Sequence, residues 1–150
     1  MAKQLGDILV DAEIISKKTL ERALERQKRL GLRLGQVLEE MGVITEQELV
    51  EALGKQFNFK TIKGLAGYSY PKEILELFPV EFAMKRLVFP VKQKDMMLAV
   101  AITDPFDSDT TELLSRITGM QVVPVIASRS DILEAISKHY LNVVANPDAG

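Results

Sequence analysis

An internal repeat is the feature that most constrains what this chain can fold into. Residues 4–27 read QLGDILVDAEIISKKTLERALERQ, and residues 33–56 read RLGQVLEEMGVITEQELVEALGKQ. Position 33 matches position 4, and at this offset of 29 residues eight positions are identical, including a Leu-Gly pair near the start and a glutamine at the end. Repeats of this length are typical of supersecondary units that bury their apolar faces against each other. We therefore expect two similar units packed together.

Each copy has the pattern of a short helix, a turn and a longer helix. In the second copy, Thr45 and Glu48 have the spacing of a capping box, in which each side chain accepts a backbone N–H of the other residue. Ser16 can cap the equivalent helix of the first copy, although Thr19 supplies no carboxylate there. Leucines and alanines then recur on one helical face in both copies. The expected structure of residues 1–57 is a four-helix bundle.

The remainder of the chain predicts a small α/β domain. Residues 58–70 lack helical periodicity and are expected to form a connector. Pro71 and Pro79 suit the first turns of two short helices, and Gly119 suits a helix C-cap. The predicted strands are VFPVKQ, MMLAVAI and QVVPVIA, and the further predicted helices are TTELLSRIT and SDILEAISKHYL. The fold class is therefore α+β, a helical bundle followed by a domain over residues 71–142 with a mixed sheet of about three strands. Residues 143–150 are expected to be a tail or the start of a linker.

Composition excludes several classes of chemistry. The chain has no cysteine, which removes disulfides, thiolate catalysis and zinc–thiolate sites and favours a reducing compartment. Its formal net charge is -2 and no basic stripe stands out, which argues against DNA as a partner. The longest apolar run, residues 96–102, is far shorter than the ~20 residues that span a bilayer. We expect a cytoplasmic chain without direct membrane insertion.

The sequence contains no catalytic or metal-binding constellation. His139 is the only histidine, so we expect a structural role for it. Asp104, Asp107 and Asp109 precede a predicted helix, where loop carboxylates usually act as caps, and they do not match a calcium loop. The phosphate-binding pattern GxxxxGK[ST] does not occur in the 150 residues. The chain is therefore expected to be no enzyme by itself and to hold no metal or cofactor.

Two pairs of repeated residues each allow a structural interpretation and a ligand-binding one. Gln27 and Gln56 stand at the margin of the apolar stripe, where each amide either bonds a nearby backbone group, reaches solvent, or recognises a polar ligand. Gly6 and Gly35 either permit a tight helix entry or let a ligand approach backbone amides, where a phosphate would be favoured. Arg33 beside such a glycine can fork onto phosphate oxygens or onto the O6/N7 edge of a guanine.

This tandem pattern resembles the MshEN-like N-terminal domain of type II secretion and type IV pilus assembly ATPases. In part of that family the motif binds cyclic di-GMP. The second copy keeps the family pattern at Arg33, Leu34, Gly35, Leu38, Gly42, Val43, Ile44, Leu49, Leu53 and Gln56. The first copy keeps it at Leu5, Gly6, Leu9, Val10, Ile14, Ile15, Leu20, Leu24 and Gln27. LAVAITDPFD, ELLSRITG and AISKHY resemble the second half of the same region, so the resemblance covers nearly the whole chain.

The resemblance implies a set of ligand-binding residues and three departures from the motif. Gln4 stands where the family has arginine, Glu13 where it has glycine, and Glu39 where an apolar residue is usual. A neutral amide in place of arginine loses a charge-assisted fork, at a cost of about 1.5–3 kcal/mol. The implied ligand-binding residues are Gln4, Leu5, Gly6, Leu9, Leu24, Gln27, Arg33, Leu34, Gly35, Gln36, Leu38, Leu53 and Gln56.

Two functions follow from the resemblance. The first is a regulatory and docking domain that senses cyclic di-GMP for a motor whose ATPase core lies beyond residue 150. The second is a docking module that binds an inner-membrane platform protein without binding nucleotide, which the departures at Gln4, Glu13 and Glu39 favour. In both, the expected place is the cytoplasm, peripheral to the inner-membrane machinery. Secretion and pilus systems share this region, so both remain open.

Overall fold

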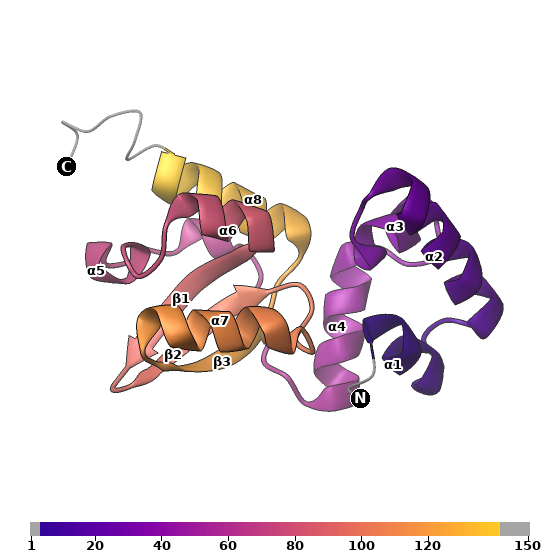
Figure 1. The fold of residues 1–150 in the computed structure, drawn as a ribbon, viewed down its shortest axis with the longest axis horizontal. Helices are drawn as coiled ribbons and strands as arrows, with labels where there is room; N and C mark the ends of the chain where they lie inside the picture. Colours follow the sequence, from indigo (N-terminus) through magenta and orange to yellow (C-terminus); the bar gives the residue numbers. More distant parts are fainter. Residues whose placement is uncertain (1–3, 142–150) are drawn as a thin grey trace. The chain divides into compact units, whose positions relative to one another are not determined.

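The chain divides into two compact units, and each is described by itself. The computed structural model describes residues 4–141. The first unit is Met1–Asn58 and the second is Phe59–Gly150 (Figure 1). The tail predicted at 143–150 lies outside the described residues.

The first unit consists of the four helices that the repeat predicts. They are α1 (Leu5–Asp11), α2 (Lys17–Leu30), α3 (Leu34–Glu40) and α4 (Glu46–Phe57), so each copy has a helix of seven residues and then a longer one. The Ser16 hydroxyl accepts the Thr19 N–H at the start of α2. Both hydrogen bonds of the Thr45–Glu48 capping box are present at the start of α4. The predicted helix starts are therefore confirmed.

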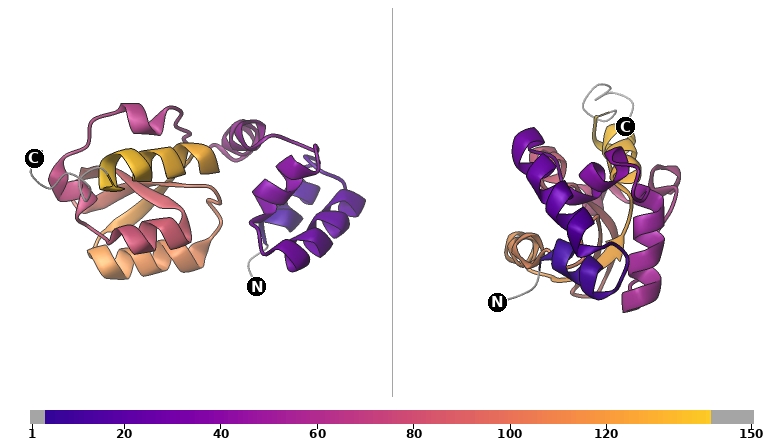
Figure 2. Two further views of the ribbon diagram at one scale, coloured as in Figure 1. Left: turned by 90° about the horizontal axis from the view of Figure 1, so that it is seen from above. Right: turned by 90° about the vertical axis from the view of Figure 1, so that its right-hand side faces the viewer.

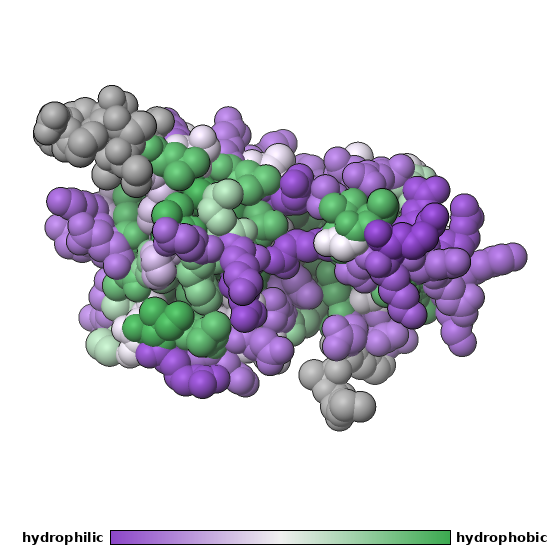
Figure 3. Space-filling view, turned by 45° about the horizontal axis from the view of Figure 1, so that its top comes forward, coloured by the Kyte–Doolittle hydropathy of each residue, from purple (hydrophilic) through white to green (hydrophobic). Residues whose placement is uncertain are grey.

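The apolar faces of these helices meet in a small core. The fully buried residues Leu9, Ala23, Val37, Leu38 and Leu53 come from all four helices. The charged residues of α2 are exposed, and the face of this unit that Figure 3 shows is largely hydrophilic (purple). A helix with one apolar stripe gains stability chiefly from such packing.

The second unit follows the predicted order of helices and strands. Its elements are η1 (Leu65–Gly67), α5 (Lys72–Leu75), α6 (Val80–Arg86), β1 (Val88–Lys94), β2 (Met97–Ile102), α7 (Ser108–Thr118), β3 (Gln121–Ile126), α8 (Arg129–Ile136) and η2 (Ser137–Leu141). Pro71 and Pro79 occupy the N-cap positions of α5 and α6. Gly119 ends α7 in the left-handed conformation, as expected.

The sheet is mixed and three-stranded, which confirms the predicted fold class. Its order is β1-β2-β3, with β1 antiparallel and β3 parallel to β2. The register of β1 shifts between Pro90 and Lys92, which marks a bulge. The left view of Figure 2 shows α8 and α7 on opposite sides of the sheet, and α6 contacts both α8 and β1. A single cluster of buried residues, from Leu65 to Tyr140, forms the core between these layers.

The segment expected as a connector is also a structural part of the second unit. The N–H of Ile62 donates to the carbonyl of Ile126 (3.0 Å), so the chain runs beside the end of β3. Leu65 and Ala66 are buried in the core cluster. The periodicity of residues 58–70 gives no sign of this role because only two of the residues are buried, within one short 3-10 turn.

The last predicted helix, residues 130–141, is not regular throughout. The α-helix ends at Ile136 and continues as a π-helical turn to Leu141, in which Tyr140 is buried against Phe89. A π-helical turn shifts the direction of the following side chains, which the sequence pattern alone does not indicate. Within residues 4–141, no helix has both the length and the apolar character needed to cross a membrane.

Candidate functional site

The two copies of the repeat place their first residues in equivalent positions. Gln4 is the N-cap of α1 with φ -74° and ψ 159°, and Arg33 is the N-cap of α3 with φ -73° and ψ 151°. Neither side chain caps its own helix. Gln4 is exposed and Arg33 is half-buried. The motif's arginine position is thus structurally the same in both copies, although only the second copy carries the cation.

The two repeated glycines allow close packing between helices. A Cβ on Gly6 would lie 2.5 Å from Cδ1 of Leu20 and 3.3 Å from Cδ2 of Leu34. A Cβ on Gly35 would lie 3.3 Å from Cδ2 of Leu49, the residue equivalent to Leu20. Each glycine therefore faces the second helix of its own copy. For Gly6, close packing against Leu20 and Leu34 explains why the position has no side chain.

The departure at Glu13 falls on a position with unusual backbone geometry. Glu13 has φ 61°, and the equivalent Gly42 has φ 72°. This left-handed region is open to glycine and costs other residues roughly 1–2 kcal/mol. The family's glycine therefore has a conformational reason, and the glutamate adopts the same conformation at that cost.

The departure at Glu39 has a structural explanation. A carboxylate oxygen of Glu39 accepts the backbone N–H of Glu46, the first residue of α4. The first N–H groups of a helix lack partners within the helix, so this contact stabilises the start of α4. Glu39 is exposed, and its replacement of an apolar residue leaves the buried core of the unit unchanged.

The two closing glutamines differ in exposure. Gln27 is half-buried on α2, whereas Gln56 is exposed on α4. Within residues 4–141, neither side-chain amide has a hydrogen-bond partner. Both amides are thus available to a ligand or to water. The sequence pattern places both glutamines at the margin of an apolar stripe. It does not show that only Gln27 is partly shielded from solvent.

Burial separates the implied ligand-binding residues into two groups. Five are core residues, which pack inside the unit and present little surface: Gly6, Leu9, Leu34, Leu38 and Leu53. The other eight are partly or fully exposed: Gln4, Leu5, Leu24, Gln27, Arg33, Gly35, Gln36 and Gln56. Among the exposed apolar residues, Leu24 is 42% accessible although it stands at a core position of the repeat. Only the second group can meet a ligand without movement of the helices.

Local electrostatics in the first unit are dominated by the capping box. The backbone N–H of Thr45, and then its hydroxyl, hold the pKa of the Glu48 carboxyl below its usual value. Among the described residues, no group of three His, Asp or Glu side chains could hold a metal ion. The carboxylate of Asp107 caps α7, and Nε2 of His139 lies 3.0 Å from the carbonyl of Ala66. These contacts agree with the structural roles expected from the sequence.

The chain belongs to the MshEN domain family, whose pattern matches residues 61–145. It is 36% identical over 140 residues to the type IV pilus assembly ATPase PilB of Myxococcus xanthus, covering 93% of this chain and 25% of that protein. It is 31% identical over 140 residues to PilB of Thermus thermophilus, covering 92% of this chain and 16% of that protein. The chain therefore spans a quarter or less of these relatives.

Two solved structures have the same fold. MshE with cdg superposes with a TM-score of 0.70 at 29% identity, over 92% of this chain and 99% of that one. The N-terminal domain of XpsE superposes with a TM-score of 0.71 at 20% identity, over 93% of this chain and 99% of that one. The resemblance noted in the sequence is thereby confirmed: this is an N-terminal domain of the kind found in type II secretion and type IV pilus ATPases.

Proposed function

We propose that this chain is a regulatory and docking domain of a secretion or pilus assembly motor and that its tandem repeats bind cyclic di-GMP. The observation that carries the proposal is the equivalence of the two copies, with Gln4 and Arg33 at the same N-cap position and nearly the same backbone angles. Cyclic di-GMP has two guanines and two phosphates, so two equivalent helix pairs suit its symmetry.

The structural relative supports this ligand. MshE with cdg, which we read as cyclic di-GMP, has the same fold over nearly its whole length. Arg33 would then donate a fork of hydrogen bonds to a phosphate or a guanine edge. Gln27, Gln56 and the weaker Gln4 would recognise polar edges, and the accessible Leu24 would cover part of a ring face.

ATP hydrolysis belongs in this proposal to the remainder of the protein. The chain has no GxxxxGK[ST] loop to cradle a nucleotide triphosphate, so by itself it would regulate and dock. It would act in the cytoplasm, where the platform proteins of the inner-membrane machinery would be its partners. Ligand binding to the first unit would then alter how the motor engages them.

Calorimetric titration of the 150-residue chain with cyclic di-GMP tests the ligand. We expect saturable heat, and we expect Arg33→Ala to weaken binding by about 1.5–3 kcal/mol, which is tenfold to a hundredfold, because a charge-assisted fork is lost. Arg29→Ala is the matched control, an exposed arginine at the end of α2 outside the motif, and should leave binding unchanged. Gln4→Arg, which restores the family residue, should tighten binding by a similar factor.

The absence of heat and of competition at tens of micromolar (an affinity of roughly 6–7 kcal/mol) would remove cyclic di-GMP from the proposal. Equal effects of Arg33→Ala and Arg29→Ala would show that binding does not use the motif. GMP, with one base and one phosphate, is the ligand control and should bind much more weakly because it can engage only one copy.

A second candidate is a docking module that binds no nucleotide. The residue that favours it is Gln4, because the first copy lacks the cation that the second copy has at the equivalent position. Co-purification with the cytoplasmic domain of a secretion or pilus platform protein tests it. Capture that is insensitive both to Arg33→Ala and to added cyclic di-GMP would favour docking alone.

A further inference from the structure

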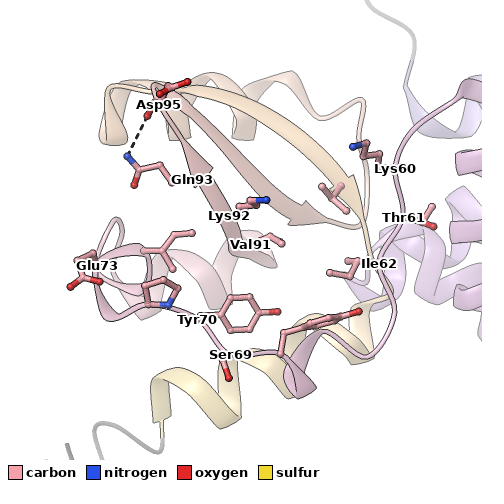
Figure 4. A pocket seen from close by; sticks show the side chains of 14 residues that line it. Lys60, Thr61, Ile62, Ser69, Tyr70, Glu73, Val91, Lys92, Gln93 and Asp95 are labelled. Carbon is pink, nitrogen blue, oxygen red and sulfur yellow. Dashed lines mark hydrogen bonds between the residues drawn. The ribbon is translucent and has the colours of Figure 1, made fainter.

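The second unit contains a cleft that the proposed function does not use. Its volume is about 840 Å³. Three parts of the chain that are far apart in sequence bound it, residues 60–62, residues 68–74 and residues 91–95, and β3 contributes Val125 (Figure 4). This volume is in the range of roughly 300–1,000 Å³ that is usual for small-molecule sites.

The floor of the cleft is apolar, and a hydrogen bond holds its tyrosine ring in place. Ile62, Tyr70 and Val91 are half-buried there, and Val125 is buried. The Tyr70 hydroxyl donates to the carbonyl of Leu65 at 2.5 Å, so this aromatic ring presents its apolar body to the cleft rather than a free polar group. A ligand with an apolar body would gain affinity from the apolar surface that it removes from water here.

Two lysines reach the cleft from opposite edges of the sheet. Lys92 lies on β1 opposite Ala99, and Lys60 is anchored beside β3 because its carbonyl accepts the N–H of Ile126 at 2.9 Å. In Figure 4 the amine ends of Lys60 and Lys92 point toward one another. Both side chains are exposed, and neither has an ion-pair partner within residues 4–141. An anion between them would gain from both charges.

The opposite end of the cleft carries the other sign of charge. Figure 4 shows Glu73 and Asp95 away from the two amine ends, with Gln93 beside Asp95. Neither carboxylate has an ion-pair partner in the described part of the chain. A second negative group on a ligand would be repelled at that end, so the charge pattern selects a molecule with an anionic group at one end only.

We propose that this cleft binds a small organic anion, whose apolar body lies over Ile62, Tyr70 and Val91 and whose carboxylate or sulfonate lies between Lys60 and Lys92. The apolar floor would contribute little to an inorganic ion, and a neutral molecule would not use the two lysines. The site lies entirely in the second unit, so it stands or falls independently of cyclic di-GMP binding to the repeats.

The probe for this site is 8-anilinonaphthalene-1-sulfonate, an aromatic monoanion whose fluorescence rises on binding. We expect saturable binding to the 150-residue chain, with amide chemical-shift changes centred on Ile62, Val91 and Val125 in heteronuclear NMR spectra. Lys60→Gln and Lys92→Gln should each weaken binding about two- to fivefold, as partly exposed charge pairs do, and the double variant should weaken it by roughly tenfold. The electrically neutral N-phenyl-1-naphthylamine should bind at least as weakly as the probe binds to the double variant.

Lys63→Gln and Lys94→Gln are the matched controls. Both lysines are exposed neighbours in the same two segments and do not line the cleft, so these variants should bind the probe as the unaltered chain does. Unchanged binding by the double variant, shift changes outside the cleft, or equal binding of the neutral compound would each overturn the proposal. Far-ultraviolet circular dichroism of every variant verifies folding, because the probe also binds partly unfolded chains.

Discussion

Glu13 and Gly42 occupy equivalent places at the turn inside each repeat, and both have positive φ. A glycine reaches this conformation without steric conflict, whereas a residue with a Cβ does not. The glutamate is exposed and therefore makes no buried contact that would offset the cost. The two copies thus share a backbone shape even where their residues differ, which indicates that the surrounding helices impose the turn.

Glu13→Gly should therefore stabilise the first unit. We expect the free energy of unfolding to rise by about 0.5–1 kcal/mol, because relief of the left-handed conformation exceeds the added entropy of glycine in the unfolded chain. Gly42→Ala should lower it by about 1 kcal/mol. Beyond the two chain neighbours, no heavy atom of the described residues lies within 4 Å of a Cβ built on Gly42, so that loss reports backbone conformation. Urea denaturation followed by circular dichroism measures both, and effects of the same sign would contradict this account.

At the scale of helices, the short and long helices of each copy meet at equivalent positions, and they approach more closely in the first copy than in the second. Gly6 faces Leu20 and Gly35 faces Leu49, which are equivalent pairs between the short and long helices of each copy. Leu34 of α3, which belongs to the second copy, also approaches Gly6, so this contact joins the two copies as well. Leu20 is itself buried, and side chains in a close-packed interior have little room to shift.

Gly6→Ala should be more disruptive than Gly35→Ala. The added methyl group at position 6 would lie within 2.5 Å of Leu20, and we expect a cost of about 1–3 kcal/mol that exceeds the roughly 1 kcal/mol gained from helix propensity. At position 35 the closest contact is 3.3 Å, so a change within about 1 kcal/mol of zero is expected. Thermal unfolding of both variants measures the difference.

A Leu20→Ala background is the control for that comparison. It removes the atom that the new methyl group would meet, so the gap between the two glycine variants should shrink. If Gly6→Ala remained equally costly in that background, the cause would lie elsewhere than in the contact with Leu20.

At the scale of the molecule, the core of the second unit includes two tyrosines, Tyr140, which is buried, and Tyr70, which is half-buried. Burial, and then the charge of Tyr68, raise the pKa of Tyr70 to about 12. Burial also raises the pKa of Tyr140, whose hydroxyl is buried without a hydrogen-bond partner among the described residues. In both cases the folded state favours the neutral phenol over the phenolate, so folding and alkaline pH are linked.

The second unit should lose stability at alkaline pH. A raised pKa contributes stability that is complete below the unfolded value near 10 and is lost as pH rises through the folded value, so the urea midpoint should fall between about pH 9 and pH 12. Tyr70→Phe should reduce this fall, and at neutral pH it should cost about 1 kcal/mol for the lost bond to Leu65. Tyr68→Phe is the control, since burial is the main cause of the shift. Equal pH profiles of Tyr70→Phe and the unaltered chain would contradict this assignment.

The sequence alone was sufficient for the features that depend on neighbours in the chain. The repeat, the caps at Ser16 and Thr45, the end of α7 at Gly119 and the three strands all follow from local periodicity and local hydrogen bonding, and the structure confirms them. The family also follows from the sequence, and the family pattern that matches covers residues 61–145, beyond the tandem repeat.

Only the tertiary structure decided which of these residues are accessible and which distant ones meet. Burial divides the motif residues, so Leu38 and Leu53 belong to the core while Leu24 does not. Lys60 and Lys92 are 32 positions apart and carry no shared motif, yet they line one cleft because Lys92 lies on β1 and Lys60 is hydrogen-bonded to β3 of the same sheet. Solvent exposure and contact between distant residues depend on the packing of whole elements, which no local pattern contains.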